Sequence, residues 1–478
     1  MTTPHIRSAE LEREKHLRLL SDTDRDIIRL VHDPLFPRWL EQVKAIGGCA
    51  HPVYLSGSTV TRDALTGEVT SSYSTAGEPG ERLAVRCRNR RASVCEPCAY
   101  LHAGDTFQLI RAGLSGGKKV PATVRGHPRL FVTLTAPSFG PVHRFRDGEW
   151  CRPRRDGGVC EHGRPVGCGL VHTEDDPSLG RPLCPDCYDY VAHVLWHAHA
   201  GRLWDRFTTA VRRHLASAGG IRRSKLGDHL VVSFAKVAEY QKRAAIHFHG
   251  VVRLDGPASP GDPSPDWATA ELLADAVKTA AASANVRAPE SDAYGTELIV
   301  FGRQFAVKPI RAFADGEGPT DDAVAAYVAK YVSKGTAETG AGLDYRVTSL
   351  DDIHAAVVTP HVRALMATCW RLGSLPELEH LRLLTWAHSL GYRGHILTKS
   401  RRYSTTYTAL REERSAYRRG DTVPIDNPAV ITASSWRYVG SGYTPGEAGI
   451  AAGIAEDLVI SRQLAREVME DEGRGWEL

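Results

Sequence analysis

The sequence predicts an α+β fold, and three features of the chain support this prediction. Two neighbouring apolar segments, residues 229–241 and 245–254, have the composition of strands and are joined by a short turn. Residues 191–218 place apolar side chains at helical spacing. Residues 141–190 are instead rich in Gly, Pro, Cys and Arg and lack periodicity, which is typical of an irregular insertion.

The remaining patterns divide the chain into three regions. Residues 1–85 begin with two helical patterns, at 9–20 and 24–43, and continue into a Ser/Thr/Gly-rich stretch of strands and loops. Residues 346–478 read as a mostly helical region that could contact DNA. The middle region, 86–345, holds the strand pair and the insertion, together with further helices at 100–112, 269–283 and 321–334 and strands at 130–135 and 298–301.

Bulk properties are those of a cytoplasmic globular protein of 478 residues with 42% hydrophobic and 24% charged residues. We expect no membrane partner, because no run of about 18 apolar residues occurs and the first residues are polar. The net charge is only +4, but basic residues cluster. Such clusters are either solvated loops or contacts to a polyanion. The candidate DNA-binding residues are Arg88, Arg90, Arg91, Lys399, Arg401 and Arg402.

Nine of the ten cysteines precede position 188, and four of them form two C-x₂-C pairs. In a reducing compartment this spacing is typical of structural zinc sites rather than disulfides. One predicted site combines Cys160, Cys168, Cys184 and Cys187. A second combines Cys87, Cys95 and Cys98 with a fourth ligand from Cys49, His51 or Cys151; joining both pairs in a single site is equally compatible with the sequence. Cys369 stands apart and is predicted to be a buried thiol.

A His-Phe-His triplet at 247–249 lies within the second apolar strand. Residues two apart on a strand point to the same face, so His247 and His249 project together. The short turn brings Glu239 of the preceding strand beside them. Two imidazoles and a carboxylate suit Mn²⁺ or Mg²⁺ with open positions for a phosphodiester. Taken by itself, the triplet is better explained as an accidental exposed strand face, and the neighbouring motifs change that interpretation.

The segment DDAVAAYVAKYVSK, residues 321–334, predicts a helix that begins at two aspartates. At about 100° per residue, Tyr327, Lys330, Tyr331 and Lys334 share one face roughly 100° wide. Two lysines make full burial of that face expensive, so we expect an exposed surface with two phenols and two cations. Such a face suits attack on a phosphate, although an amphipathic surface helix would look the same.

These motifs, in chain order, resemble one protein family. FVTLT at 131–135, HFH at 247–249 and YVAKY at 327–331 are similar to the three signatures of HUH-type rolling-circle replication initiators. Further stretches, including CRNRRASVCEPC, CEHGRPVGC and LTKSRRYSTT, resemble initiators of actinobacterial plasmids and integrative conjugative elements. The resemblance extends over about residues 85–410, most of the chain.

The resemblance implies a fold and a set of roles. In the HUH endonuclease domain, a central five-stranded antiparallel sheet is backed by helices, and its middle strands carry the first motif beside the histidine pair. Carried onto this sequence, His247 and His249 are metal ligands and Glu239 is the third. Tyr331 is the expected nicking nucleophile and Tyr327 the second tyrosine, while Lys330 and Lys334 steer the scissile phosphate.

The implied activity is metal-dependent, strand-specific nicking at a replication origin through a 5′-phosphotyrosine, followed by strand transfer and religation. The expected cofactors are Mn²⁺ or Mg²⁺ at the nicking site and structural Zn²⁺. The chain lacks a G-x-x-x-x-G-K-[ST] motif, so we expect a host helicase and DNA polymerase as partners at the origin DNA.

Two other interpretations remain open from the sequence. A relaxase or single-strand transposase uses the same chemistry, but relaxases usually place the tyrosine ahead of the histidines and use a third histidine. A zinc-dependent DNA-binding regulator without catalysis is the alternative from another class. Incubation with origin plasmid and a divalent cation distinguishes this regulator from a nicking enzyme, because a regulator would shift the DNA and leave it intact.

Overall fold

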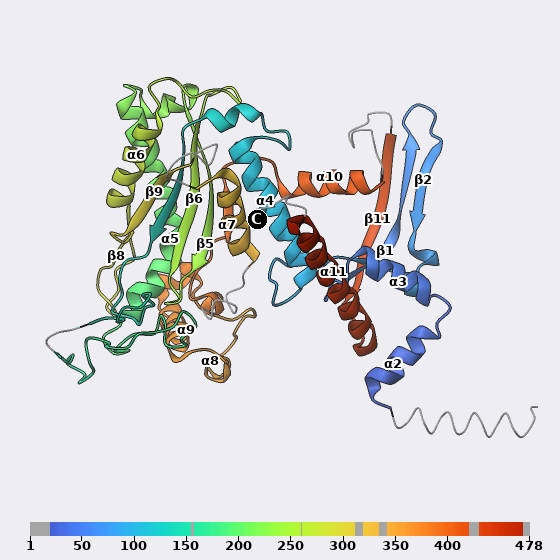
Figure 1. Cartoon of the computed structure of the whole chain (residues 1–478), viewed down its shortest axis with the longest axis horizontal. Helices are drawn as coiled ribbons and strands as arrows, with labels where there is room; N and C mark the ends of the chain where they lie inside the picture. Colours follow the sequence, from blue (N-terminus) through green and yellow to red (C-terminus); the bar gives the residue numbers. More distant parts are fainter. Residues whose placement is uncertain are drawn as a thin grey trace, which may run out of the picture. The chain divides into compact units, whose positions relative to one another are not determined.

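The computed structural model describes residues 20–153, 157–259, 261–310, 319–333, 342–419 and 430–471. The chain forms two compact units, one of Met1–Gly104 with Arg411–Glu477 and the other of Asp105–Leu410 (Figure 1). This division cuts across the three consecutive regions expected from the sequence, because a strand near the C-terminus pairs with one near the N-terminus. Among the described residues, no helix has both the length and the apolar character needed to cross a membrane.

The larger unit is built on a five-stranded sheet in which every neighbouring pair is antiparallel. Its middle strand is β6 (Ile246–Asp255), which pairs with β5 (Val231–Tyr240) on one side and β4 (Arg129–Thr135) on the other. The edges are β10 (Leu397–Lys399) and β9 (Phe305–Pro309). The predicted α+β class is confirmed.

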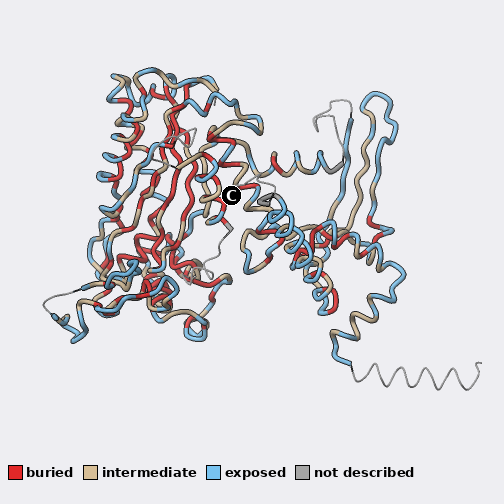
Figure 2. Tube along the Cα trace, viewed as in Figure 1, coloured by how far each residue is buried: buried red, intermediate tan, exposed pale blue. Residues whose placement is uncertain are grey.

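Helices cover both faces of this sheet, as Figure 1 shows. On one face lies α5 (Tyr190–Ala218), whose Trp204 ring lies 5.7 Å from the ring of Phe248 in β6, and beside it α6 (Ala270–Ser283). On the other face α7 (Asp321–Ser333) packs on β5, and its Val328 shares a buried apolar cluster with Val237 of that strand. Because side chains alternate along a strand, the two faces of β6 are chemically distinct. Figure 2 shows the strands between these layers as mostly buried.

The sequence explains where these helices begin. The Asp189 side chain accepts a hydrogen bond from the Ala192 amide at the start of α5, and Thr269 does the same for Leu272 in α6. Two further helices, α8 (Leu350–Ala355) and α9 (Pro360–Gly373), complete the layer beside α5. A short pair of strands, β7 (Asn285–Arg287) and β8 (Leu298–Val300), follows α6.

One buried polar network ties β6 to β5 and to the segment just before β4. Arg253 and Asp255 are both fully buried, and the Arg253 Nε donates to the Asp255 carboxylate over 2.7 Å. The Arg253 Nη2 also donates to this carboxylate over 3.0 Å, and His127 and Ser233 contact it at 2.8 and 2.6 Å. Burial works against ionisation of Asp255, but these hydrogen bonds outweigh it and lower the pKa of the carboxyl.

The smaller unit contains a four-stranded sheet that joins the two ends of the chain. Strand β1 (Val53–Asp63) pairs along its whole length with β11 (Val430–Ser441) and also with β2 (Val69–Ser74) and β3 (Leu83–Val85). Helices α2 (Asp22–Val31), α3 (Phe36–Ala45) and α11 (Pro445–Asp471) pack in the same unit. A 12-residue strand thus interrupts the region expected to be mostly helical. Along the chain, the two points of division between the units fall inside helices: one inside α4 (Glu96–Ser115) and the other inside α10 (Tyr407–Arg419).

Candidate active site

Glu239, His247 and His249 converge on one point at the sheet surface. Glu239 of β5 is the pairing partner of His247 in β6, and His249 lies two residues further along the same face. The Glu239 Oε2 atom lies 2.9 Å from the Nε2 atom of each histidine, and the two Nε2 atoms are 3.0 Å apart. Three ligand atoms that face one another in this way, two imidazole nitrogens and a carboxylate oxygen, fit a divalent cation.

The electrostatics of these three groups follow from partial burial. The side chain of His249 is 5% exposed, while those of His247 and Glu239 are each 15% exposed. Burial lowers the pKa of His249, which favours the neutral imidazole that a metal requires. Burial opposes ionisation of Glu239, yet hydrogen bonds from both histidines lower the pKa of its carboxyl to about 2. At neutral pH these two side chains therefore offer a metal an ionised carboxylate, from Glu239, and a neutral imidazole, from His249.

Strand β4 fixes the orientation of His249 from the other side. Thr133 is the pairing partner of His249, and its Oγ1 lies 3.0 Å from the His249 Nδ1 atom. The Phe131 ring stacks on the same imidazole, with the ring centroids 5.8 Å apart. With Nδ1 engaged by Thr133, the Nε2 atom points at Glu239 and is the one left for a metal.

Helix α7 places both tyrosines beside the histidine pair. The Tyr327 hydroxyl lies 3.1 Å from the His249 Nε2, and the Tyr331 ring centroid is 6.1 Å from that of His249. The two phenol rings are 4.7 Å apart. We expected these rings on an exposed face, but they are half-buried, because Val324, Val328 and Val332 hold the helix close to the sheet.

Burial raises the pKa of both phenols, so they are protonated at neutral pH. Lys330 lies exposed on the same helix, whereas Lys334 falls outside the described residues.

The first turn of α7 is anchored to the sheet by a buried ion pair. The Asp321 carboxylate lies 2.8 Å from the Arg129 Nη1 of β4 and accepts a hydrogen bond from Ser115 of α4 over 2.8 Å. The neighbouring Asp322 pairs with Arg111 at 2.7 Å. These contacts set the helix over the sheet, two turns ahead of Tyr327.

The cysteines of the insertion form two groups whose membership differs from our expectation. Cys160, Cys184 and Cys187 come together, but their fourth member is His162. Cys168 is instead grouped with Cys151, His143 and His172, so the predicted four-cysteine site is wrong. The reason is a short antiparallel bridge between Arg152 and Cys168, which carries Cys168 to Cys151.

The third group lies in the smaller unit and consists of Cys49, Cys87, Cys95 and Cys98. The Sγ of Cys49 lies 3.6 Å from that of Cys98 and 3.8 Å from that of Cys95. Of the three fourth ligands left open by the sequence, the structure thus brings Cys49 to this group. In each of the three groups the ligand atoms lie within 4.8 Å of one another, which suits a tetrahedral structural zinc. Cys369 is fully buried, as predicted.

Three ligand candidates escaped the sequence reasoning: His143, His162 and His172. Two of them carry a local signal in the sequence: His162 follows Cys160 in Cys160-Glu161-His162, and Cys168 and His172 have C-x₃-H spacing. His143 had no local signal, because the chain brings it in from 25 residues upstream of Cys168.

The candidate DNA-binding residues lie in both units and have mixed environments. Arg88 is exposed, and Arg90 and Arg91 are partly buried in the segment before α4. The Lys399 Nζ donates to the carbonyl of Ser404 over 2.9 Å, and Arg402 donates to the carbonyl of Pro257 over 2.7 Å. Arg401, between them, is exposed.

Three side chains that could hold a metal ion lie beside two tyrosines of one helix, in a chain with basic clusters. This class of site has the groups that phosphodiester chemistry uses. Residues 35–456 match the family model RepSA, described as the replication initiator protein of pSAM2. The chain is 46% identical over 457 residues to a replication initiator protein of Streptomyces ambofaciens, covering 94% of this chain and 96% of that protein. It therefore belongs to this family of replication initiator proteins. No solved structure matches the chain significantly.

Proposed function

We propose that the protein starts rolling-circle replication by nicking one strand of its origin with a tyrosine of α7. The observation that carries this proposal is the convergence of Tyr327 and Tyr331 on the face of the sheet where Glu239, His247 and His249 meet. A phosphodiester bound there would lie between a nucleophile and a metal-ligand set.

In the proposed reaction, the hydroxyl oxygen of one tyrosine attacks the scissile phosphorus. A bond forms from this oxygen to phosphorus, the bond from phosphorus to the 3′ oxygen breaks, and the 3′ oxygen receives the proton that the phenol gives up. The products are a 5′-phosphotyrosine and a free 3′-OH that primes synthesis. Because the ester retains the bond energy, a later attack by a 3′-OH religates the strand, and the second tyrosine or a water completes the cycle.

We assign Tyr331 the first nick and Tyr327 the second, as the family resemblance implies. The raised pKa of both phenols means that neither is a ready nucleophile on its own. Glu239, His247 and His249 would hold Mn²⁺ or Mg²⁺, which supplies positive charge to the phosphate oxygens. Lys330 and Lys334 draw the phosphate toward the helix, and Thr133 keeps His249 in its ligating orientation.

We further propose that the three cysteine-containing groups bind structural zinc. The group of His143, Cys151, Cys168 and His172 carries an additional feature of such sites: the His172 Nδ1 lies 2.6 Å from the Asp176 carboxylate, leaving its Nε2 for the metal. Zinc would brace the insertion, which has short bridges in place of regular helices and strands among its described residues before α5.

The proposed partners are origin DNA and the host replication machinery in the cytoplasm. Arg88, Arg90, Arg91, Lys399, Arg401 and Arg402 would contact the DNA backbone, and a host helicase and polymerase would extend the 3′-OH. The test is incubation with supercoiled origin plasmid and Mn²⁺.

We expect nicked plasmid with covalently bound protein, lost in Tyr327→Phe/Tyr331→Phe and retained in Tyr345→Phe, an exposed tyrosine outside the site. His247→Ala should bind the origin without cleaving it. Plasmid that is bound but never cut by the unaltered protein would reject the proposal and leave a DNA-binding regulator.

A further inference from the structure

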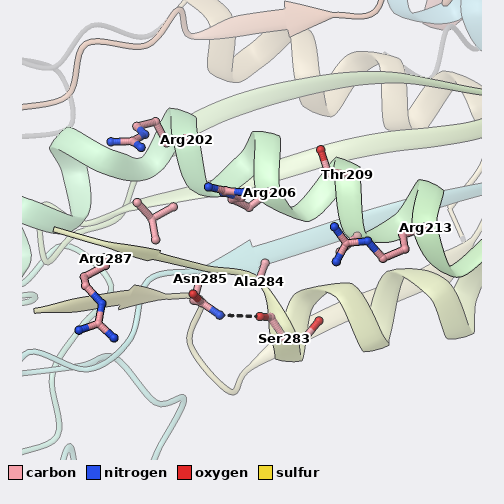
Figure 3. Close-up of a pocket in the computed structure, with 10 residues that line it drawn as sticks. Arg202, Arg206, Thr209, Arg213, Ser283, Ala284, Asn285 and Arg287 are labelled. Atoms are coloured by element: carbon pink, nitrogen blue, oxygen red, sulfur yellow. Dashed lines mark hydrogen bonds between the residues drawn. The ribbon is translucent and has the colours of Figure 1, made fainter. Parts of the chain in front are cut away.

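A second basic surface lies on the sheet face opposite the tyrosines. A cleft of about 600 Å³ opens between α5 on one side and the end of α6 with β7 on the other (Figure 3). Its lining includes four arginines and three small polar side chains, one of which is Ser283. We call this surface the arginine cleft: Arg202, Arg206, Thr209, Arg213, Asn285 and Arg287.

The helical arginines form a straight row. At about 100° per residue, Arg206 lies about 40° and Arg213 about 20° around the helix from Arg202, so all three share one narrow stripe. At 1.5 Å per residue the row is about 16 Å long. All three are exposed, and Figure 3 shows Arg287 of β7 across the cleft from them.

The charge of this row is not compensated among the described residues. None of the four arginines makes an ion pair or a side-chain hydrogen bond there. One acid of α6, Asp275, pairs instead with His214 of α5 at 3.1 Å. An uncompensated row of cations favours an anionic ligand.

The shape of the row indicates which anion. A single phosphate would need cations that converge on one point, whereas these are spread along a line. A row of guanidinium groups suits successive phosphates of a nucleic acid strand, and guanidinium is the cation best matched to phosphate oxygens. Because the chain belongs to a family of replication initiators, we take the duplex of its origin to be this nucleic acid.

The opposite placement of the two sites follows from the strand pattern. Trp196 and Trp204 of α5 contact Phe248, whose side chain points away from those of its neighbours His247 and His249. The arginine cleft therefore lies behind the sheet, and the histidines and tyrosines in front of it.

We propose that the arginine cleft holds the phosphate backbone of duplex DNA next to the nick site, so that the origin contacts both faces of the sheet. The identification of this DNA as origin sequence rests on the proposed nicking function. The electrostatic contact itself does not depend on cleavage.

The test compares Arg206→Gln/Arg213→Gln with a charge-matched control, Arg346→Gln/Arg371→Gln, at exposed positions outside the cleft. Duplex affinity is measured between 50 and 200 mM salt. Each lost phosphate contact reduces the slope of log K against log salt by about 0.9, so the cleft variant should lose about 1.8 and the control should match the unaltered protein. Arg206→Lys/Arg213→Lys keeps the charge and should retain the slope.

Cleavage of a short single-stranded origin oligonucleotide separates the two proposals, because that substrate does not reach the cleft. We expect the cleft variant to cut it at the unaltered rate. An unchanged salt slope in the glutamine variant would overturn the inference and leave the nicking proposal intact. If the unaltered protein and all variants fail to cut the oligonucleotide while the salt slope still changes, the nicking proposal is rejected. The proposal that the arginine cleft binds DNA is then retained.

Discussion

Thr133 gives the sharpest perturbation of the proposed metal centre, because it contacts the site through a single hydrogen bond. Thr133→Val preserves the shape of the side chain but removes the oxygen that lies 3.0 Å from the His249 Nδ1. His249 then loses the partner that fixes its ring. Loss of such a partner typically weakens metal binding about 10- to 100-fold, which corresponds to about 1.4–2.7 kcal/mol.

The assay is calorimetric titration of the purified protein with Mn²⁺, followed by nicking over a range of Mn²⁺ concentrations. We expect weaker binding and a nicking curve shifted to higher Mn²⁺, with the rate restored near saturation. Thr133→Ser should behave as the unaltered protein does. Thr135→Val is the matched control, since Thr135 lies on the same strand face and donates to Gln304 rather than to a histidine. Unaltered Mn²⁺ affinity in Thr133→Val would refute the reasoning.

Three further predictions concern the anchor of α7, the buried lysine and the zinc groups. Asp321→Asn leaves Arg129 buried without its counter-charge, so the free energy of unfolding, measured by denaturant titration, should fall by about 3–5 kcal/mol. A loss below about 1 kcal/mol would contradict this prediction. Burial lowers the pKa of Lys236 to about 8, so between pH 8 and about 10 the unfolded chain binds more protons, and stability should rise by up to about 1.4 kcal/mol per pH unit. The free energy of unfolding of Lys236→Met should not rise over this pH range. The same pH dependence in both proteins would contradict the prediction. Cys184→Ser should reduce the zinc content, measured by mass spectrometry of the metals, from three equivalents to two, and three remaining equivalents would show that this group holds none.

Local sequence patterns predicted the elements of the larger unit well. The strands with Glu239 and the histidine pair form a hairpin, and the helix expected at 321–334 is α7, because apolar periodicity and an acidic first turn act within one element. The placement of Tyr327 against His249 required more than periodicity, since it depends on the buried contacts of α7 with β5 and on the pair between Asp321 and Arg129.

What the sequence did not predict depends on contacts between distant residues. The pairing of Val53 with Ser441 and of Asp63 with Val430 joins segments almost 400 positions apart, which no local pattern encodes. Cys168 was assigned to the wrong group because ligand spacing says nothing about the bridge that carries it to Cys151. The arginine row of α5 is visible as i, i+4 and i+11 spacing, but only its exposure and lack of counter-charges make it a candidate surface.

Identification of the covalent peptide is the most direct test of the nicking mechanism. Trypsin cleaves after Lys330, so the two tyrosines fall on different peptides, 312–330 with Tyr327 and 331–334 with Tyr331. After reaction with a labelled origin oligonucleotide and nuclease digestion, mass spectrometry should find a phosphonucleotide on the peptide of Tyr331 first, and on that of Tyr327 when Tyr331→Phe is used. Cleaved DNA with neither peptide modified would contradict a tyrosine nucleophile.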